Sequence, residues 1–454
     1  MSGNNLYFGM VQAELCHVKK GTKRILQDTI AKYQDATSYL IHVVCDHIDE
    51  ILSLSANEQL RKMEELIHHT KANPSPQYKD FDTLFYKFPS YLRRAAIRSA
   101  IGHVQSHESR CDEYYEKRDF LVKKGFHYKK MEPAFSYYPN AWPTLYKGQS
   151  FNRDKKTVQI KAYVRNTWDW IEVSIPNRDY KNLMKAMSLG TLKNPNLVYK
   201  YHKFYLQFPV QYSSVKFPEI QLEDQTVLGV DLGFNNPAVC SVVDSTGTIH
   251  QRDFSPFKKD MDRISHILGL IKKKQRTSGK GQSLSSLYTK LSGLKENLVK
   301  QLSRWIVNLA MEYGVYGIVL EHLVGIQGKK SMKDKVHHWC VARIRDFIKG
   351  MAFREGIRLF IVNPNGTSMY AYDGSGKVDK DKHNHSLYTF SNGKRYNCDL
   401  SASYNIGARY FIRAYHKSIP ATEWSQFKAK VPGLSKRTEW TLSSLRNLSE
   451  VLVP

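Results

Sequence analysis

The spacing of hydrophobic residues along this chain divides it into three regions. From about Lys23 to Phe120 apolar residues recur with a period near 3.6, which predicts amphipathic helices. From Val158 to Val210 apolar and polar residues alternate, as in antiparallel strands. From Thr226 onward short apolar runs alternate with helical segments, the pattern of a mixed sheet covered by helices.

Composition adds a strong positive charge to this picture. The 454 residues are enough for two or three domains, and 68 Lys and Arg against 42 Asp and Glu leave a net charge of +26. An excess of this size usually means a polyanionic partner, most often nucleic acid. The alternative is a generally basic surface or one that binds anionic lipids.

Two basic segments are candidates for phosphate contact. The segment Tyr91–His107 is expected to be a helix, and a helix carrying arginines is either a solvated face or a phosphate-tracking one. The second segment, residues 272–282, is expected to be a solvent-facing loop between two helices. The candidate contacts are Arg93, Arg94, Arg98, Lys272, Lys273, Lys274, Arg276 and Lys280.

Other classes of protein are disfavoured. No stretch approaches the ~20 apolar residues of a membrane span. The N-terminus lacks the features of a secretory signal, and residues 1–9 are compatible with a tag remnant ahead of Met10. The six cysteines are scattered without a CxxC pair, which favours reduced thiols in a cytosol over disulfides or a simple zinc finger.

Three acids stand at unusual positions in the third region. Asp231 lies within an apolar strand, Glu321 ends the strand YGIVLEHL, and Asp399 begins the helix CDLSASYNIGARY. In a mixed sheet such positions can meet at one edge, where ionised carboxylates repel one another. Mg²⁺ relieves this repulsion, and two ions ~4 Å apart can activate water and stabilise the leaving oxygen of a phosphodiester.

Each acid also has a simpler interpretation. Asp231 is suited to a turn before Gly233, and Glu321 to the surface at a strand end. Asp399 is suited to the N-cap of its helix. The three acids together indicate a metal site more strongly than any one of them does, because the order, spacing and context of all three match one arrangement.

The segments GVDLGFNNPAVCSVVD, IVLEHLVGI and CDLSASYNI resemble the three split motifs of the RuvC nuclease domain. The form is that of the TnpB nucleases of transposons and the type V CRISPR effectors, and the resemblance is clear from about Thr226 to Ala408. It implies that Asp231, Glu321 and Asp399 are catalytic and hold two Mg²⁺ ions. It also implies that Asn405, at the helix asparagine of the family, supports the active site.

The resemblance implies a multidomain α+β fold. A helical recognition lobe and a small β-barrel wedge domain would precede an RNase H-like (RuvC) α/β nuclease domain with a degenerate zinc-ribbon-like insertion. The expected divisions are 1–22 for the start of the wedge domain, 23–125 for the helical lobe, 126–222 for the wedge barrel, 223–365 for RuvC motifs I and II, 366–397 for a target-binding insertion, and 398–454 for RuvC motif III and the C-terminal tail.

Two departures from the family stand out. The Thr367-Ser368 pair that usually introduces a zinc ribbon is present, but no cysteine pairs follow it. Cys398, His383 and His385 alone do not make the four ligands of a structural zinc site, so zinc is not expected and the insertion is expected to grip substrate without metal. Ser401 and Ser403 replace the usual Asn and Ala.

The function implied by the resemblance is RNA-guided cleavage of DNA. The partners would be a structured guide RNA and double-stranded target DNA beside a short flanking motif, in a prokaryotic cytoplasm at the nucleoid and without a membrane. Trp168 and Tyr201 are candidates for contact with the RNA or the flanking duplex, and core packing is their alternative. The family leaves open whether the chain acts as a monomer or a homodimer, and where the guide originates.

Two other functions remain as alternatives. An unguided, structure-selective nuclease would use the same acids, but the ~220 residues before the RuvC motifs and the long insertion between the first two acids argue against it. A repressor that binds DNA under RNA guidance without cutting it is disfavoured because all three acids are present.

Overall fold

The structure is a computed structural model that describes residues 7–128, 130–212, 217–233, 236–277, 284–322, 332–381, 384 and 386–452, with the side chains of 332–339 left out. The chain divides into two compact units. One unit spans Phe8–Ser213, and the other comprises Ser214–Pro454 with Met1–Tyr7. Each unit contains hydrophobic clusters of its own.

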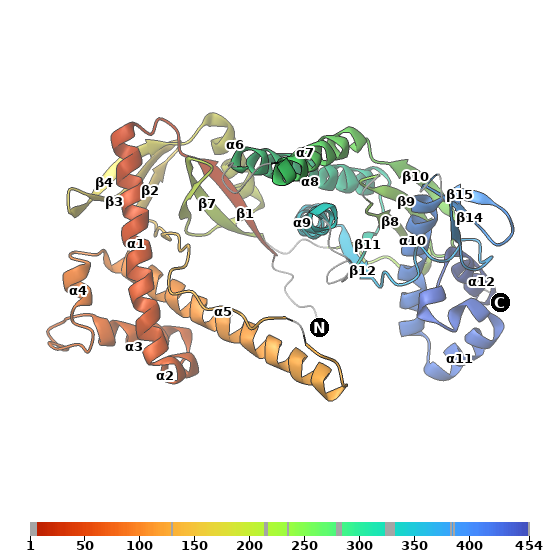
Figure 1. Ribbon diagram of the computed structural model, residues 1–454, viewed down its shortest axis with the longest axis horizontal. Coiled ribbons are helices and arrows are strands. Elements are labelled where there is room, and N and C mark those ends of the chain that lie inside the picture. The colour runs from red at the N-terminus through yellow and green to blue at the C-terminus, as the bar shows by residue number, and fades with distance from the viewer. Residues whose placement is uncertain are drawn as a thin grey trace. The chain divides into compact units, whose positions relative to one another are not determined.

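The region with the 3.6-residue apolar period forms helices, as predicted (Figure 1). The longest of them packs along the first, where the hydroxyl groups of Tyr33 and Ser99 lie 3.0 Å apart. It extends beyond the predicted Tyr91–His107 because the residues that follow are polar but favour helix. The helices up to residue 123 are α1 Lys20–Asp46, α2 Ile48–Ser53, α3 Ala56–Ile67, α4 Phe81–Leu84 and α5 Ser90–Lys123.

The strands of the first unit form two small sheets rather than the expected barrel. The first sheet has the order β1-β7-β5 with β6 also paired to β7, and the second has the order β2-β3-β4. Neither closes on itself within the described residues, since three or four strands are too few to enclose a core. The elements are β1 Tyr7–Glu14, β2 Phe151–Asp154, β3 Thr157–Val164, β4 Thr167–Ser174, α6 Asn177–Leu189, β5 Gly190–Leu192, β6 Asn196–Lys200 and β7 Lys203–Tyr212.

The second unit is built on a five-stranded mixed sheet with the order β10-β9-β8-β11-β12. The first three strands are an antiparallel meander, and β11 and β12 continue parallel to β8. This agrees with the mixed sheet that the sequence pattern predicted. The strands are β8 Thr226–Asp231, β9 Val239–Asp244, β10 Ile249–Phe254, β11 Gly317–Glu321 and β12 Arg358–Val362, and a 3₁₀ turn at Leu222–Asp224 leads into the first.

Helices cover both faces of this sheet, which explains why its strands are apolar on both sides. Leu228 and Val230 of β8 face a cluster with α7 Lys258–Thr277, α8 Ser285–Glu312 and α9 Met332–Arg354. Val227 of the same strand faces a cluster with α10 Cys398–Ser418, α11 Ala421–Lys430 and α12 Leu442–Leu452. Two 3₁₀ turns, η2 Pro432–Leu434 and η3 Arg437–Glu439, connect α11 to α12.

Another small sheet lies between β12 and α10 in the chain. Its strands β13 Asp379–Lys380, β14 Leu387–Thr389 and β15 Arg395–Asn397 are antiparallel. Ala371, Tyr388, Phe390 and Cys398 form its own hydrophobic cluster, so apolar packing supports it. His383 and His385 lie outside the described residues. Over the described part of the whole chain, no helix is long and apolar enough to cross a membrane.

Candidate functional site

Two of the three acids end adjacent strands at one edge of the five-stranded sheet. β8 and β11 run parallel with Leu320 paired to Val230, so the residues that follow, Glu321 and Asp231, leave the sheet side by side. Asp231 is the last residue of β8 rather than a mid-strand residue as the sequence pattern indicated. The carboxyl ends of neighbouring parallel strands therefore bring these two side chains together.

The helix α10 carries the third acid onto the same sheet. It lies close against β8 because glycines meet at the crossing: a Cβ atom on Gly229 would stand 2.8 Å from the backbone nitrogen of Gly407. Asp399 lies in the first turn of this helix but is not its N-cap. The cap is Asn397, whose side chain accepts a hydrogen bond of 3.0 Å from the backbone N–H of Leu400. The N-cap role, the simpler interpretation of Asp399, is therefore filled by Asn397.

The Asp399 carboxylate is instead oriented by two neighbours. The Asn236 side-chain amide donates a hydrogen bond of 2.6 Å to Oδ2, and the Cys398 thiol donates one of 3.1 Å to Oδ1. Asn236 lies just before β9, on the loop that also follows Asp231. The segment that follows Asp231 thus also carries Asn236, the residue that orients Asp399.

Electrostatics show that the three acids act on one another. Burial raises the pKa of Asp231 well above its ordinary value, and the charges of Glu321 and Asp399 raise it further. Burial also raises the pKa of Glu321, while the Thr367 hydroxyl and the Arg409 charge oppose that rise. No side chain in the described part of the chain donates a hydrogen bond to Asp231. Its charge is therefore destabilised, and a cation would relieve it.

The donor set suits a hard divalent cation. Carboxylate oxygens are the ligands that Mg²⁺ prefers, and it retains water and phosphate oxygens beside them. Among the described residues, no group of three or more His, Cys, Asp or Glu is close enough to hold one metal ion. Repulsion between carboxylates acts over longer distances than metal ligation, and in two-ion sites the acids are shared between ions ~4 Å apart. The three carboxylates can therefore suit Mg²⁺ even though they do not all converge on a single ion.

Glu321 is held by a residue that the sequence analysis noted only as a motif marker. The Thr367 hydroxyl donates a hydrogen bond to Oε1 of Glu321, and Thr367 is buried. Asn405 fixes the backbone around it, because its amide donates bonds of 3.0 Å to the carbonyls of Thr367 and Tyr370. Its side-chain oxygen accepts a bond of 3.0 Å from the N–H of Leu442. Asn405 therefore acts on Glu321 through Thr367 rather than by touching the acids.

A buried arginine ties the same region to the C-terminal segment. Arg409 on α10 is 3% exposed, and burial lowers its pKa to about 10 although Glu321 opposes this effect. Its guanidinium donates to four backbone carbonyls, two after β12 and two around η3: those of Asn363, Asn365, Thr438 and Trp440. The sequence offers no signal for these bonds, since carbonyl acceptors are present at every residue.

The predicted phosphate contacts of the second unit lie on a helix rather than in a loop. α7 continues to Thr277 because Ile264, Leu268 and Ile271 extend its buried face. The candidates on its last turns, Lys272, Lys273, Lys274 and Arg276, are all exposed. Lys280 lies outside the described residues.

The three candidate arginines of α5 have different surroundings. Arg93 is 7% exposed, with its guanidinium 3.6 Å from Glu64, and Arg94 forms a hydrogen bond of 3.0 Å with the same carboxylate. Arg98 is exposed. Shared pairing with Glu64 gives the first two a role within the helical region, and Arg98 has the exposure that a phosphate contact needs.

The two candidate aromatic residues also differ. Trp168 is 9% exposed and packs edge-on against Phe88, with ring centroids 5.2 Å apart, so its placement favours the core role. Tyr201 is 58% exposed and lies at the turn between β6 and β7 with a positive φ of 52°. The Lys200 ammonium lies over its ring, 4.8 Å from the centroid.

Comparisons with known proteins agree with the motifs. The Aq_aa04 family model matches residues 10–164. A TnpB-like protein, aq_aa05 of Aquifex aeolicus (strain VF5), is 24% identical over 215 residues, which cover 42% of this chain and 68% of that protein. The cryo-EM structure of CasPhi-2 (Cas12j) bound to crRNA has the same fold at 9% identity, with a TM-score of 0.51 over 90% of this chain and 99% of that one. A Cas12f1-sgRNA-target DNA complex matches at 13% identity with a TM-score of 0.41, over 89% of this chain and 99% of that one.

Proposed function

We propose that this chain is an RNA-guided DNA endonuclease. The premise is that it is a relative of the TnpB-like proteins and the type V CRISPR effectors, which its motifs and the comparisons both support. The observation that carries the proposal is the cluster of acids in the second unit. Asp231 and Glu321 end adjacent parallel strands, and both Glu321 and Asp399 raise the pKa of Asp231. Such a cluster at a sheet edge is suited to metal-assisted hydrolysis of phosphodiesters.

The roles of the individual side chains follow from their contacts. Asp231, Glu321 and Asp399 would hold Mg²⁺, which when bound supplies an activated water and stabilises charge on the phosphate. Thr367 keeps one oxygen of Glu321 in place, and Asn236 does the same for Asp399. Because these supports lie on short, packed segments, the carboxylates would keep their positions while substrate enters.

The guide RNA and the target DNA in this proposal are inferred from the structures of the relatives. CasPhi-2 was determined with crRNA, and Cas12f1 with an sgRNA and target DNA. Base pairing would read the target, and the protein would bind the nucleic acids through backbone charge and shape. The net charge of +26 is suited to this role. We assign phosphate contacts to Arg98 and to the exposed end of α7, stacking to Tyr201, and substrate contact to the small β13–β15 sheet.

The proposal is tested by the RNA that accompanies the protein. The full chain is expressed with its flanking genomic sequence and purified, and the bound RNA is sequenced. We expect a discrete species with a constant scaffold and a variable end that matches DNA cut by the complex. Random cellular fragments, together with Mg²⁺-dependent cutting of branched DNA in the absence of RNA, would instead establish an unguided nuclease. Guided binding of target DNA without cutting would establish a repressor.

A further inference from the structure

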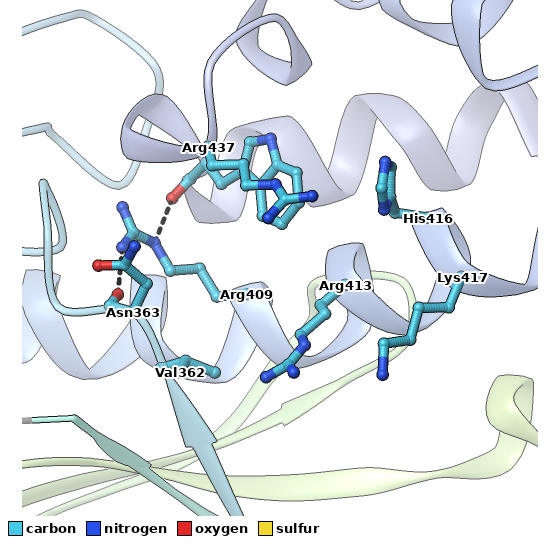
Figure 2. A pocket seen from close by; sticks show the side chains of 8 residues that line it. Val362, Asn363, Arg409, Arg413, His416, Lys417 and Arg437 are labelled. Atoms are coloured by element: carbon cyan, nitrogen blue, oxygen red, sulfur yellow. Dashed lines mark hydrogen bonds between the residues drawn. The ribbon is translucent and has the colours of Figure 1, made fainter. Parts of the chain in front are cut away.

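A basic pocket lies in the second unit, beside the end of β12. Its volume is about 340 Å³, and it is open to solvent between the C-terminal half of α10 and the turn η3 (Figure 2). Among the described residues, no Asp or Glu lines it. The lining residues are Val362, Asn363, Arg409, Arg413, His416, Lys417, Arg437 and Trp440.

Three of its cations are available to a ligand. Arg413, Lys417 and Arg437 are exposed, and none of them forms an ion pair with an acid among the described residues. Arg413 donates one hydrogen bond of 3.0 Å, to the carbonyl of Ile361, which leaves its other N–H groups for a ligand. The acid on η3, Glu439, is paired with Lys436 at 3.5 Å rather than with the pocket.

The remaining polar groups shape the pocket. The guanidinium of Arg409 is occupied by four backbone carbonyls, so it adds positive charge to the floor without turning toward a ligand. The guanidinium of Arg437 lies over the ring of Trp440, 6.0 Å from its centroid, and this contact favours one orientation of the side chain. A planar guanidinium held in this way can bind two oxygens of an anion at once.

The field inside the pocket is positive. Burial lowers the pKa of His416, and the charges of Arg437 and Lys428 lower it further. The ring of His416 also packs edge-on against Trp424, with centroids 4.7 Å apart, which fixes the wall of the pocket. Cations are thus held close together without acids, an arrangement that a bound anion would stabilise.

The pocket adjoins the acid cluster. Val362, on its rim, is the residue paired with Glu321 across β11 and β12. Arg409, in its floor, is close enough to Glu321 to lower the pKa of that acid. A strand that places one phosphate at the acids would therefore have another part of its backbone near this pocket.

We propose that the pocket formed by Arg413, Lys417 and Arg437 binds a backbone phosphate of the nucleic-acid strand that enters the acid cluster. The assignment of that strand rests on the proposed nuclease function, whereas binding of the phosphate does not require cleavage. A phosphate fits the pocket because its oxygens can accept bonds from several cations at once. The pocket is also open to solvent, as binding of one group within a longer chain requires.

The test compares a triple pocket variant with a control that loses the same charge, and adds a double pocket variant that loses one charge less. The pocket variant carries Arg413→Gln, Lys417→Gln and Arg437→Gln, and a second pocket variant carries only Lys417→Gln and Arg437→Gln, which keeps the Arg413 bond to Ile361. The control carries Lys258→Gln, Lys259→Gln and Lys290→Gln, which are exposed and outside the pocket. All are made in the full chain with Asp231→Asn to prevent cutting, and are freed of nucleic acid. Binding of a short fluorescent oligothymidylate is measured by anisotropy across a salt titration in EDTA, after thermal unfolding confirms that each variant is folded.

We expect the pocket variants to bind roughly tenfold more weakly than the control, with a salt slope shallower by about 0.7 for each phosphate that the pocket no longer neutralises. Equal affinity and slope in pocket and control variants would overturn the proposal. A second arm adds inorganic phosphate and follows thermal stability. Stabilisation that is lost only in the pocket variants, with oligothymidylate binding unchanged, would identify a small-anion site and also overturn the strand assignment.

The outcome separates this proposal from the nuclease function. If the chain with intact acids cuts DNA and the pocket variants bind oligothymidylate like the control, the pocket proposal fails and the nuclease stands. If the pocket variants lose affinity and the chain with intact acids cuts no DNA, phosphate binding stands and the nuclease function fails.

Discussion

Gly229 on β8 and Gly407 on α10 lie against each other where the helix crosses the strand. A Cβ atom on Gly229 would meet the carbonyl oxygen of Ser403 and stand 2.8 Å from the nitrogen of Gly407. The contact is between two backbones, which do not rearrange as a flexible side chain does. It sets how closely the helix that carries Asp399 approaches the strand that carries Asp231.

Substitution at this crossing tests that role. Gly229→Ala is expected to destabilise the protein by about 1–3 kcal/mol and to lower cleavage more than this loss of stability explains, because α10 must move away from β8. Urea unfolding and a cleavage rate measured well below the unfolding temperature separate the two effects. Gly293→Ala, within α8, is the control, since no described atom beyond its chain neighbours and the helix's own backbone lies within 4 Å of the added Cβ. That change is expected to stabilise the protein by about 0.5–1 kcal/mol, and an equal loss of cleavage in both variants would contradict the role of the crossing.

The hydroxyl of Thr367 is expected to set the pH dependence of cleavage. Thr367→Val removes the hydrogen bond that stabilises ionised Glu321, so the pKa of this acid rises further above its ordinary value. Ionised Glu321 is then reached only at higher pH, and the acid limb of the pH–rate profile moves to higher pH. Thr367→Ser keeps the hydroxyl and is expected to restore the wild-type profile. A profile that does not move in the valine variant would show that Thr367 does not act through Glu321.

Asp231 is expected to destabilise the protein when no metal is bound. Its pKa is raised in the folded chain, whereas in the unfolded chain it is near the ordinary value of about 3.9. The unfolded state therefore releases this proton first, and the folded state loses stability as pH rises from about 4 through the raised pKa. Asp231→Asn removes this cost.

Thermal unfolding in EDTA measures the effect. At neutral pH we expect Asp231→Asn to raise Tm by about 2–4 °C for each kcal/mol of relieved repulsion, with the difference vanishing toward pH 4. Mg²⁺ is expected to raise the Tm of the wild type more than that of the variant, because only the wild type keeps the full set of carboxylates. A lower Tm for the variant in EDTA would contradict the unrelieved charge at Asp231.

Asn405 is expected to matter for stability as well as for the site. Asn405→Ala leaves the carbonyls of Thr367 and Tyr370 and the N–H of Leu442 without this partner, at a cost of about 2–4 kcal/mol. Ser403→Ala is the matched control on the same helix, because the Ser403 side chain is also buried but, among the described residues, bonds only to the carbonyl of Leu400 one turn earlier. Chemical denaturation of both variants compares them, and similar losses would show that Asn405 has no special role.

The sequence predicted those features that depend on local pattern. The strands that end at Asp231 and Glu321 and the helix that begins at Cys398 followed from apolar periods and motif order. The supports of the acids were not predictable in this way. Thr367 bonds to a residue 46 positions away, and Asn236 to one 163 positions away. Arg409 bonds to residues up to 46 positions away, and no local pattern encodes such bonds.

Three other differences have physical causes. The expected barrel is two open sheets, because alternation predicts strands but not how many of them pair. The basic segment after Ile271 is helical through Thr277, because the buried face of α7 outweighs its charge. The segment after Tyr415 is rich in Ser and Lys with weak periodicity, so its pattern predicts no element. Leu442, Leu445 and Leu448 of α12 are nevertheless fully buried in the cluster that they share with α10.

The measurement that tests the central claim most directly is cleavage of target DNA by the RNA-bound protein in Mg²⁺, comparing the wild type with Asp231→Asn, Glu321→Gln and Asp399→Asn. We expect the wild type to cut DNA that matches its RNA, and each single variant to bind the same DNA and lose cutting by a factor of about 10³ or more. Cutting that continues in any one of the three variants, or that is unchanged after the RNA is removed, would contradict the assignment.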